Sequence, residues 1–120
     1  MSSAEMAVGY VRRLVEMETR GWGDQKDALK RVASRYRVPF WTLDRIRSGR
    51  AKTVDAGIFS RIREAFIDQC ERSAARLLHD AEIEKAVNPH VHLDDLEDQI
   101  RALVARLENA KATAPRGGAQ

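Results

Sequence analysis

The chain has 120 residues and a formal net charge of +3; 43% of its residues are hydrophobic and 32% are charged. This balance excludes a disordered chain and two ordinary domains, and it favours one compact, helix-rich domain with an extension. No run approaches the roughly 18 apolar residues of a membrane span, so we expect no membrane partner. The first residues do not resemble a secretory signal, and the single Cys70 suits a reducing compartment. We therefore expect a cytoplasmic protein.

The charge is unevenly distributed along the chain. Residues 26–63 contain eleven Lys or Arg residues and three Asp residues, which gives this stretch a net charge of +8. From residue 66 onward, seven Lys or Arg residues face ten Asp or Glu residues, a net charge of −3. A basic segment joined to a mildly acidic one indicates a unit that binds a polyanion, followed by a part that does not bind it.

The amino-terminal residues predict two helices separated by glycines. Residues 4–20 carry apolar side chains at helical spacing, and the two glycines of the sequence RGWGD end that helix. Asp24 then has the position of an N-cap, and we expect its carboxylate to accept a hydrogen bond from the first amides of the next helix. This second helix is predicted to run to about Arg37.

A third, short helix is predicted to follow almost immediately. Proline suits the first position of a helix because it has no N–H to lose, so we expect this helix to begin near Pro39 and to stop at Gly49. Its inward positions would be Leu43 and Ile46, three residues apart. Residues 25–48 are therefore predicted to form a helix, a tight turn and a short helix.

The run DALKRVASRYRVPFWTLDRIRSGRAK resembles the helix-turn-helix of the phage-repressor and Cro-like DNA-binding superfamily. Ala33 stands where that family has a small residue that permits close helix crossing, and Val38 stands where it has a hydrophobic residue after the turn. Gly49 matches the glycine that typically closes the next turn. The family often has glycine in the turn itself, whereas this chain has Arg37, which must then adopt a left-handed conformation. The resemblance covers roughly residues 5–70.

The resemblance implies an all-α protein whose third helix binds double-stranded DNA in the major groove. Arginine can bind guanine through two hydrogen bonds, and an aromatic ring can pack on thymine methyl groups or the sugar edge. The residues expected to face bases are Phe40, Trp41, Asp44 and Arg45. The residues expected to meet phosphates are Arg35, Arg37, Thr42, Arg47, Ser48, Arg50 and Lys52.

The aromatic pair also has a structural interpretation. One ring, Phe40 more readily than Trp41, could fold back onto Tyr36 or onto the first helix. Both rings could also be structural, with no ligand contact. The sequence leaves these alternatives open.

The chain after the basic segment predicts a long helix. Thr53 or Asp55 is a possible N-cap, and apolar residues at helical spacing extend from Ile58 to Ala81. The first half of this helix would close the core of an amino-terminal head, residues 1–70. The second half continues further than a compact head requires, and we expect it to find another partner.

Residues 71–112 are expected to form a helical extension for dimerisation. Pro89 interrupts the long helix, and Asp94 followed by Glu97 predicts a capping box at the start of a last helix. The last helix carries apolar residues at the heptad spacing of a coiled coil. The residues expected to form the dimer contact are Leu77, Leu93, Leu96, Ile100, Leu103 and Leu107. Residues 113–120 are mostly small and predict a disordered tail.

The coiled-coil-like seam of the last helix is too short to be stable alone in water. It must therefore pack on the preceding helix, on its copy in a second chain, or on both. An intramolecular hairpin in a monomer and a four-helix dimer both fit the pattern. We favour the dimer because repressor-like heads usually read two half-sites about one helical turn apart.

The sequence offers little for catalysis or metal binding. His90 and His92 lie close to Asp94, but a His-x-His pair in a polar break is usually solvated, and Cys70 has no second cysteine at ligand spacing. We find no glycine-rich phosphate loop and no nucleophile–histidine set in the sequence. We therefore expect a protein that is not an enzyme and that needs no cofactor or metal.

These observations predict a sequence-specific transcriptional regulator that acts as a homodimer on the nucleoid, with a possible regulatory protein partner. The alternative is a protein-interaction or antitoxin-like adaptor module, in which the aromatic pair and the coiled segment bind another protein. The two hypotheses differ in their response to salt, because groove binding releases counterions and a hydrophobic protein contact does not.

Overall fold

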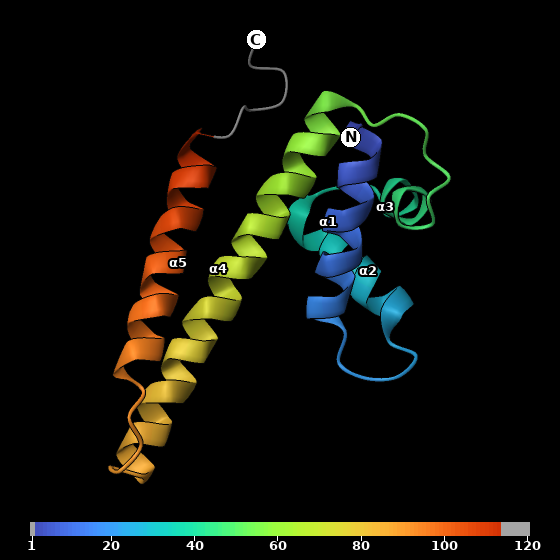
Figure 1. Ribbon diagram of the computed structural model, residues 1–120. Helices are drawn as coiled ribbons and strands as arrows, with labels where there is room; N and C mark the ends of the chain where they lie inside the picture. Colours follow the sequence, from blue (N-terminus) through green and yellow to red (C-terminus); the bar gives the residue numbers. More distant parts are fainter. Residues whose placement is uncertain (1, 114–120) are drawn as a thin grey trace. The chain divides into compact units, whose positions relative to one another are not determined.

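The computed structural model describes residues 2–113, which form five α-helices (Figure 1). They are α1 (Ser3–Glu18), α2 (Gln25–Tyr36), α3 (Phe40–Arg47), α4 (Ala56–Val87) and α5 (Asp94–Thr113). The described residues contain no strand, which confirms the all-α class, and none of their helices is long and apolar enough to cross a membrane. From residue 114 onward the predicted tail lies outside the described residues. The chain divides inside α4 into a first unit ending at Phe66 and a second unit beginning at Ile67.

The turn between α2 and α3 has a geometry that accounts for the change of chain direction. Arg37 has φ 57° and ψ 43°, the left-handed conformation that the sequence required there. The N–H of Val38 donates to the carbonyl of Ala33 over 3.1 Å, which closes a Schellman motif above the buried Val38 side chain. α3 begins at Phe40, one residue later than predicted, with Pro39 as its N-cap.

Two arginines from other helices bind the carboxyl ends of α2 and α3. Arg61 donates from Nη1 to the carbonyl of Arg37 over 3.2 Å, and Arg12 donates from Nε to the carbonyl of Arg47 over 3.2 Å. Cations are favourable at these ends because the helix dipole places partial negative charge there. Arg12 and Arg61 therefore help to fix the two helices in the first unit.

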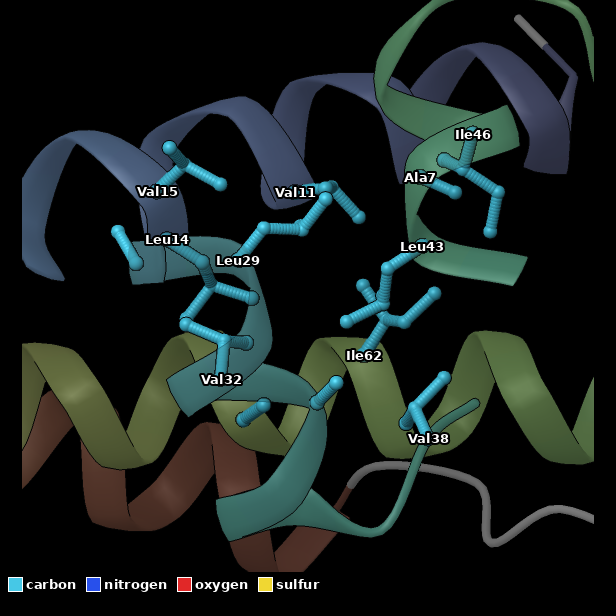
Figure 2. Packing of buried hydrophobic residues seen from close by; sticks show 13 residues of the cluster. Ala7, Val11, Leu14, Val15, Leu29, Val32, Val38, Leu43, Ile46 and Ile62 are labelled. Atoms are coloured by element: carbon cyan, nitrogen blue, oxygen red, sulfur yellow. The ribbon is translucent and has the colours of Figure 1, made fainter. Parts of the chain in front are cut away.

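The apolar core of the first unit holds the inner side of α3. Leu43 and Ile46 are each 1% exposed and belong to one cluster with buried residues of α1, α2 and the start of α4 (Figure 2). Leu14 of α1, Leu29 of α2 and Ile62 of α4 are among its largest buried side chains. The predicted inward positions of α3 are thus confirmed.

The second unit is an antiparallel pair formed by the second half of α4 and by α5. Lys85 of α4 binds Asp94 and Glu97 at the start of α5, each over 2.8 Å, and Lys111 near its end lies 3.5 Å from Glu71. Glu71 and Lys85 are 14 residues apart on α4, and their partners Lys111 and Glu97 are also 14 residues apart on α5. This constant register extends over about 20 Å of helix.

The capping box predicted at the start of α5 does not form. The buried Glu97 carboxylate binds the Lys85 ammonium of the facing helix, and Asp94, the first residue of α5, binds the same ammonium. A buried carboxylate needs a charged partner, and the antiparallel packing brings one within reach. Hydrogen bonds to Asp94 and Glu97 raise the pKa of Lys85 above its ordinary value of 10.5. A contact between helices has replaced the local one.

Candidate nucleic-acid interface

The outward side of α3 presents Trp41 and Arg45, which lie about one helical turn apart. Trp41 is 71% exposed, and the Arg45 side chain is exposed as well. Within residues 2–113 the Arg45 guanidinium makes no hydrogen bond or ion pair. A large ring and an unengaged cation therefore stand side by side on a helix whose other side is buried.

Phe40, which was expected to face bases, is half-buried instead. Its ring packs on the core cluster of the first unit. The Trp41 ring meets it edge to face, with the ring centroids 5.1 Å apart and the planes at 79°. Of the alternatives that the sequence left open, the structure therefore has Phe40 turned inward and Trp41 turned outward. Phe40 acts as a support for the exposed ring.

Asp44, the remaining residue expected to face bases, is engaged by arginines of the same surface. Its Oδ2 lies 3.1 Å from Nη2 of Arg50, and its Oδ1 lies 4.0 Å from Nη2 of Arg47. The Ser48 hydroxyl accepts a hydrogen bond from Nε of Arg50 over 2.9 Å and donates one to the carbonyl of Arg45 over 3.0 Å. Asp44 and Ser48 thus orient the Arg50 guanidinium, which remains 64% exposed and open to an anion.

A groove of about 480 Å³ runs between α3 and the loop that follows it. Thr42 and Arg45 line it from α3, and Arg50 and Lys52 line it from the loop. Asp55 also lines the groove, but its carboxylate accepts two hydrogen bonds from backbone N–H groups in the first turn of α4. Three cations and a hydroxyl along one groove suit the spaced negative charges of a nucleic-acid backbone.

Two more of the cations expected to meet phosphates lie at the ends of α3. Arg37 is exposed in the turn that precedes the helix, and Arg47 is half-buried in its last turn. The backbone carbonyls of both residues are occupied by arginines of α4 and α1, so their position is fixed. These cations extend the positive charge of the groove along the whole helix.

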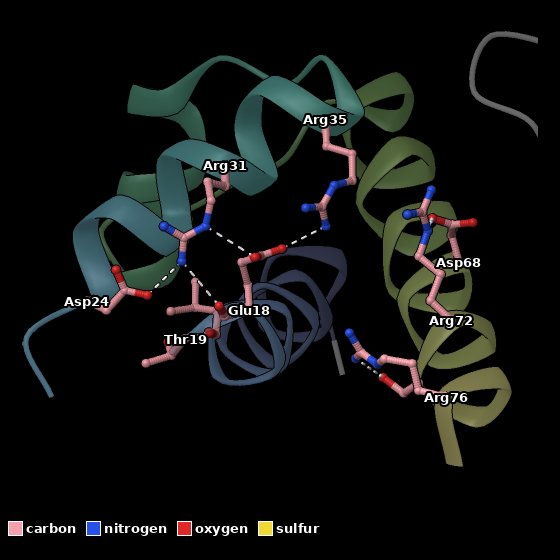
Figure 3. Close-up of polar contacts among 10 residues, drawn as sticks. Glu18, Thr19, Asp24, Arg31, Arg35, Asp68, Arg72 and Arg76 are labelled. Atoms are coloured by element: carbon pink, nitrogen blue, oxygen red, sulfur yellow. Dashed lines mark hydrogen bonds and ion pairs between the residues drawn. The ribbon is translucent and has the colours of Figure 1, made fainter. Parts of the chain in front are cut away.

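Arg35 is engaged within the first unit instead of being directed at a ligand. Its Nη1 lies 2.7 Å from the buried Glu18 carboxylate at the end of α1, and Nε of Arg31 lies 3.2 Å from the other oxygen (Figure 3). Nη2 of Arg31 also lies 2.6 Å from Asp24. The Asp24 carboxylate accepts hydrogen bonds from Arg31 and from the backbone N–H of Arg20. The predicted cap bond from Asp24 to the first amides of α2 does not form. Arg31 and Arg35 therefore join α2 to the end of α1.

This network holds two carboxyl pKa values low. Burial raises the pKa of Glu18, but hydrogen bonds from Arg35 and Arg31 outweigh burial and keep it below its ordinary value of 4.5. Hydrogen bonds from Arg31 and from the backbone of Arg20 lower the pKa of Asp24. Since both pKa values are lower in the folded state, the carboxylates stabilise the fold above their ordinary pKa, and this contribution is lost as the pH falls through the folded pKa.

We expect the free energy of unfolding of the protein to decrease between about pH 5 and pH 3. Urea titrations at a series of pH values measure this decrease. In Glu18→Gln the arginines keep a hydrogen-bond acceptor but the titrating group is lost, so the decrease should be smaller. Glu16→Gln, an exposed position on the same helix, is the matched control and should follow the unmodified protein. An equal decrease in Glu18→Gln and the unmodified protein would contradict this role of Glu18.

The predicted dimer seam divides between two directions on α5. Ile100 is 8% exposed, and Leu93 and Leu107 are half-buried. Leu96 and Leu103 are 48% and 49% exposed. Part of the apolar surface of α5 is thus covered within the chain and part is exposed, and the contact with a second chain stays a prediction.

The exposed leucines of the second unit share one side of the antiparallel pair. At about 100° per residue, Leu77 lies roughly 80° from the side of α4 that faces α5. Leu96 and Leu103 lie roughly 60–80° from the side of α5 that faces α4, in the same rotational sense. Rotation in the same sense on two antiparallel helices leads to the same side of the pair. The opposite side carries exposed charges, including Glu82 and Arg101.

Sequence reasoning did not assign a role to Trp22 or Lys26. Both line a second hollow of the first unit, together with Arg47 of α3. The available signal was a tryptophan placed between two glycines, where neither neighbour has a side chain that could cover the ring.

Comparison with protein-family models, with curated proteins and with solved structures finds no match for this chain. Within the described part of the chain, no group of three or more His, Cys, Asp or Glu side chains could hold a metal ion. The function is therefore inferred from α3, its groove and the apolar side of the second unit.

Proposed function

We propose that the protein is a sequence-specific transcriptional regulator that binds duplex DNA as a homodimer, through a helix-turn-helix of the phage-repressor and Cro-like type. α2 and α3 would be the two helices of the motif, with α3 in the major groove. The observation that carries this proposal is the exposure of Trp41 and Arg45 on a helix whose opposite side is anchored by Leu43 and Ile46. Such a protein would act on the nucleoid in the cytoplasm.

The side chains of the site divide into two roles. Arg45 would bind a guanine through two hydrogen bonds, and Trp41 would pack on a thymine methyl group or on the sugar edge. Contacts to phosphates would supply affinity and position without reading sequence. The phosphate contacts would come from Arg37, Thr42, Arg47, Ser48, Arg50 and Lys52.

The homodimer is supported by the apolar side of the second unit. Leu77, Leu96 and Leu103 are exposed on this side, where Glu84, one heptad after Leu77, is exposed as well. Two copies that meet through the same surface form a two-fold contact, and two helical pairs joined in this way make a four-helix bundle. A two-fold dimer would present two α3 helices to two half-sites about one helical turn apart.

The same three leucines also favour the second candidate function, an antitoxin-like adaptor. In that case a different protein would cover them, and the positive charge around α3 would be incidental or directed at RNA. The two functions are separated by the ligand that the protein retains and by the response of that binding to salt.

The deciding experiment is a salt titration of binding to a pool of random duplex DNA, followed by sequencing of the retained fraction. For six to ten phosphate contacts, affinity should fall by roughly three to five decades between about 50 and 200 mM salt. Enrichment of a palindromic site would support the dimeric regulator and give its half-site spacing. Absence of binding at low salt would overturn the proposal and favour the adaptor.

Arg45→Ala is expected to remove sequence preference while non-specific binding to duplex DNA remains. The loss of a bidentate contact to guanine should reduce discrimination by about 1–3 kcal/mol at one base pair of each half-site. Selection from the random pool with the variant measures the effect. Lys52→Ala is the matched control from the same groove, and it should weaken all duplexes alike and lower the salt slope by about one. An unchanged preference in Arg45→Ala would remove this residue from the base-reading set.

A further inference from the structure

The loop between α1 and α2 displays a tryptophan that the fold does not use. The Trp22 side chain is fully exposed and makes no ring contact within residues 2–113. Gly21 and Gly23 flank it, and Gly23 has φ 79°, a conformation that other residues rarely adopt. A tryptophan buries about 150–250 Å² when it packs, so this ring forgoes a large gain in stability. Large exposed aromatic side chains of this kind commonly mark binding surfaces.

Both ends of this loop are anchored. The backbone N–H of Arg20 donates to the Asp24 carboxylate over 2.9 Å, and Arg31 binds the same carboxylate. Nη2 of Arg31 also donates to the carbonyl of Glu18 over 3.2 Å, where α1 ends. The loop therefore leaves and re-enters the first unit at fixed points, and Trp22 stands out from a closed base.

The surroundings of Trp22 are cationic and continuous with α3. A hollow of about 650 Å³ beside the ring is lined by Lys26 of α2 and Arg47 of α3. Among the described residues, Lys26 is exposed and forms no ion pair, and an ion pair joins Arg47 to Asp44 over 4.0 Å. A flat apolar ring and two cations that line one hollow fit a ligand with regularly spaced negative charges and apolar sugar faces. A partner protein would more often meet such a ring in an apolar neighbourhood.

We propose that the Trp22 loop, residues 20–24, is a second DNA contact that binds the sugar–phosphate backbone beyond the base pairs read by α3. Lys26 and Arg47 meet phosphates, and Trp22 packs on a deoxyribose. Arg47 is the last residue of α3 and also lines this hollow, so one duplex can pass from α3 to the Trp22 loop. This inference rests on the proposed function and extends the length of DNA that each first unit covers.

The test compares two duplexes that contain the same selected site and differ only in their flanks, about two or about eight base pairs on each side. Trp22→Ala is expected to weaken binding to the long duplex about tenfold, within the range of aromatic contacts to nucleotides, and to leave the short duplex unaffected. Trp41→Ala, the other tryptophan of the chain, is the matched control and should weaken both duplexes alike. Trp22 is exposed, so its replacement should not alter folding, which circular dichroism checks.

Equal weakening of both duplexes by Trp22→Ala, or no weakening of either, would overturn the second contact while leaving the proposed function intact. Failure of the unmodified protein to bind either duplex would overturn both. A second readout uses Trp41→Phe, in which Trp22 is the remaining tryptophan. The long duplex should shield its fluorescence from acrylamide and the short duplex should not. If a higher concentration of the same variant shields the Trp22 fluorescence from acrylamide without any DNA, the ring contacts protein and not DNA.

Discussion

Replacement of Leu96 and Leu103 together by Asp is expected to leave the protein monomeric and to abolish its tight binding to a palindromic duplex. Both leucines are about half exposed, so the charges would be tolerated in an isolated chain. In a dimer they would be buried without partners, which costs several kcal/mol for each charge. Since two linked half-site contacts exceed one by about 10²–10⁴ in affinity, the monomer should lose that factor.

Sedimentation measures the oligomeric state, and titration against the selected duplex measures the affinity. The matched control is Ala102→Asp with Ala105→Asp, which adds the same charges to exposed positions of the same helix but on other sides of it. The control should stay dimeric and bind normally. A dimeric Leu96→Asp, Leu103→Asp variant would show that this side of the second unit is not the contact between copies.

Leu43→Ala is expected to produce the largest loss of stability among single substitutions in α3. Leu43 is 1% exposed and fixes α3 in the core of the first unit. Truncation of a buried leucine to alanine removes apolar contacts and leaves a cavity, which costs about 2–5 kcal/mol. Because α3 would then lose its fixed position, binding to DNA should weaken together with stability. Urea denaturation measures the change in the free energy of unfolding.

Arg45→Ala provides the matched control for this substitution, two residues along the same helix. Arg45 is exposed and unengaged, so its truncation should change the free energy of unfolding by less than about 0.5 kcal/mol. The two variants should therefore separate the inner and outer sides of α3, one affecting stability and the other affecting sequence preference. A stable Leu43→Ala variant with unchanged binding would contradict the role of the core in positioning the helix.

Charged residues show where reasoning from sequence alone was insufficient. Glu97 stands at a position where a carboxylate commonly caps a helix, yet it binds Lys85 of the facing helix. Asp24 stands at another such position, yet it binds Arg31, seven residues further along the chain in the helix that it was expected to cap. Arg35 belongs to the basic segment, but its guanidinium binds the buried Glu18 carboxylate. Sequence spacing describes neighbours within one helix, whereas the partners of Glu97 and Arg35 are brought to them by packing between helices.

The sequence by itself determined the helices, the left-handed turn at Arg37 and the inward positions Leu43 and Ile46. These features depend on local backbone preferences and on helical periodicity, which act over a few residues. Only the tertiary structure decided that Trp41 faces outward on Phe40, and that Leu96 and Leu103 remain exposed while Ile100 is covered. Exposure depends on which surfaces meet, and a heptad pattern does not specify how wide a stripe a single neighbouring helix covers.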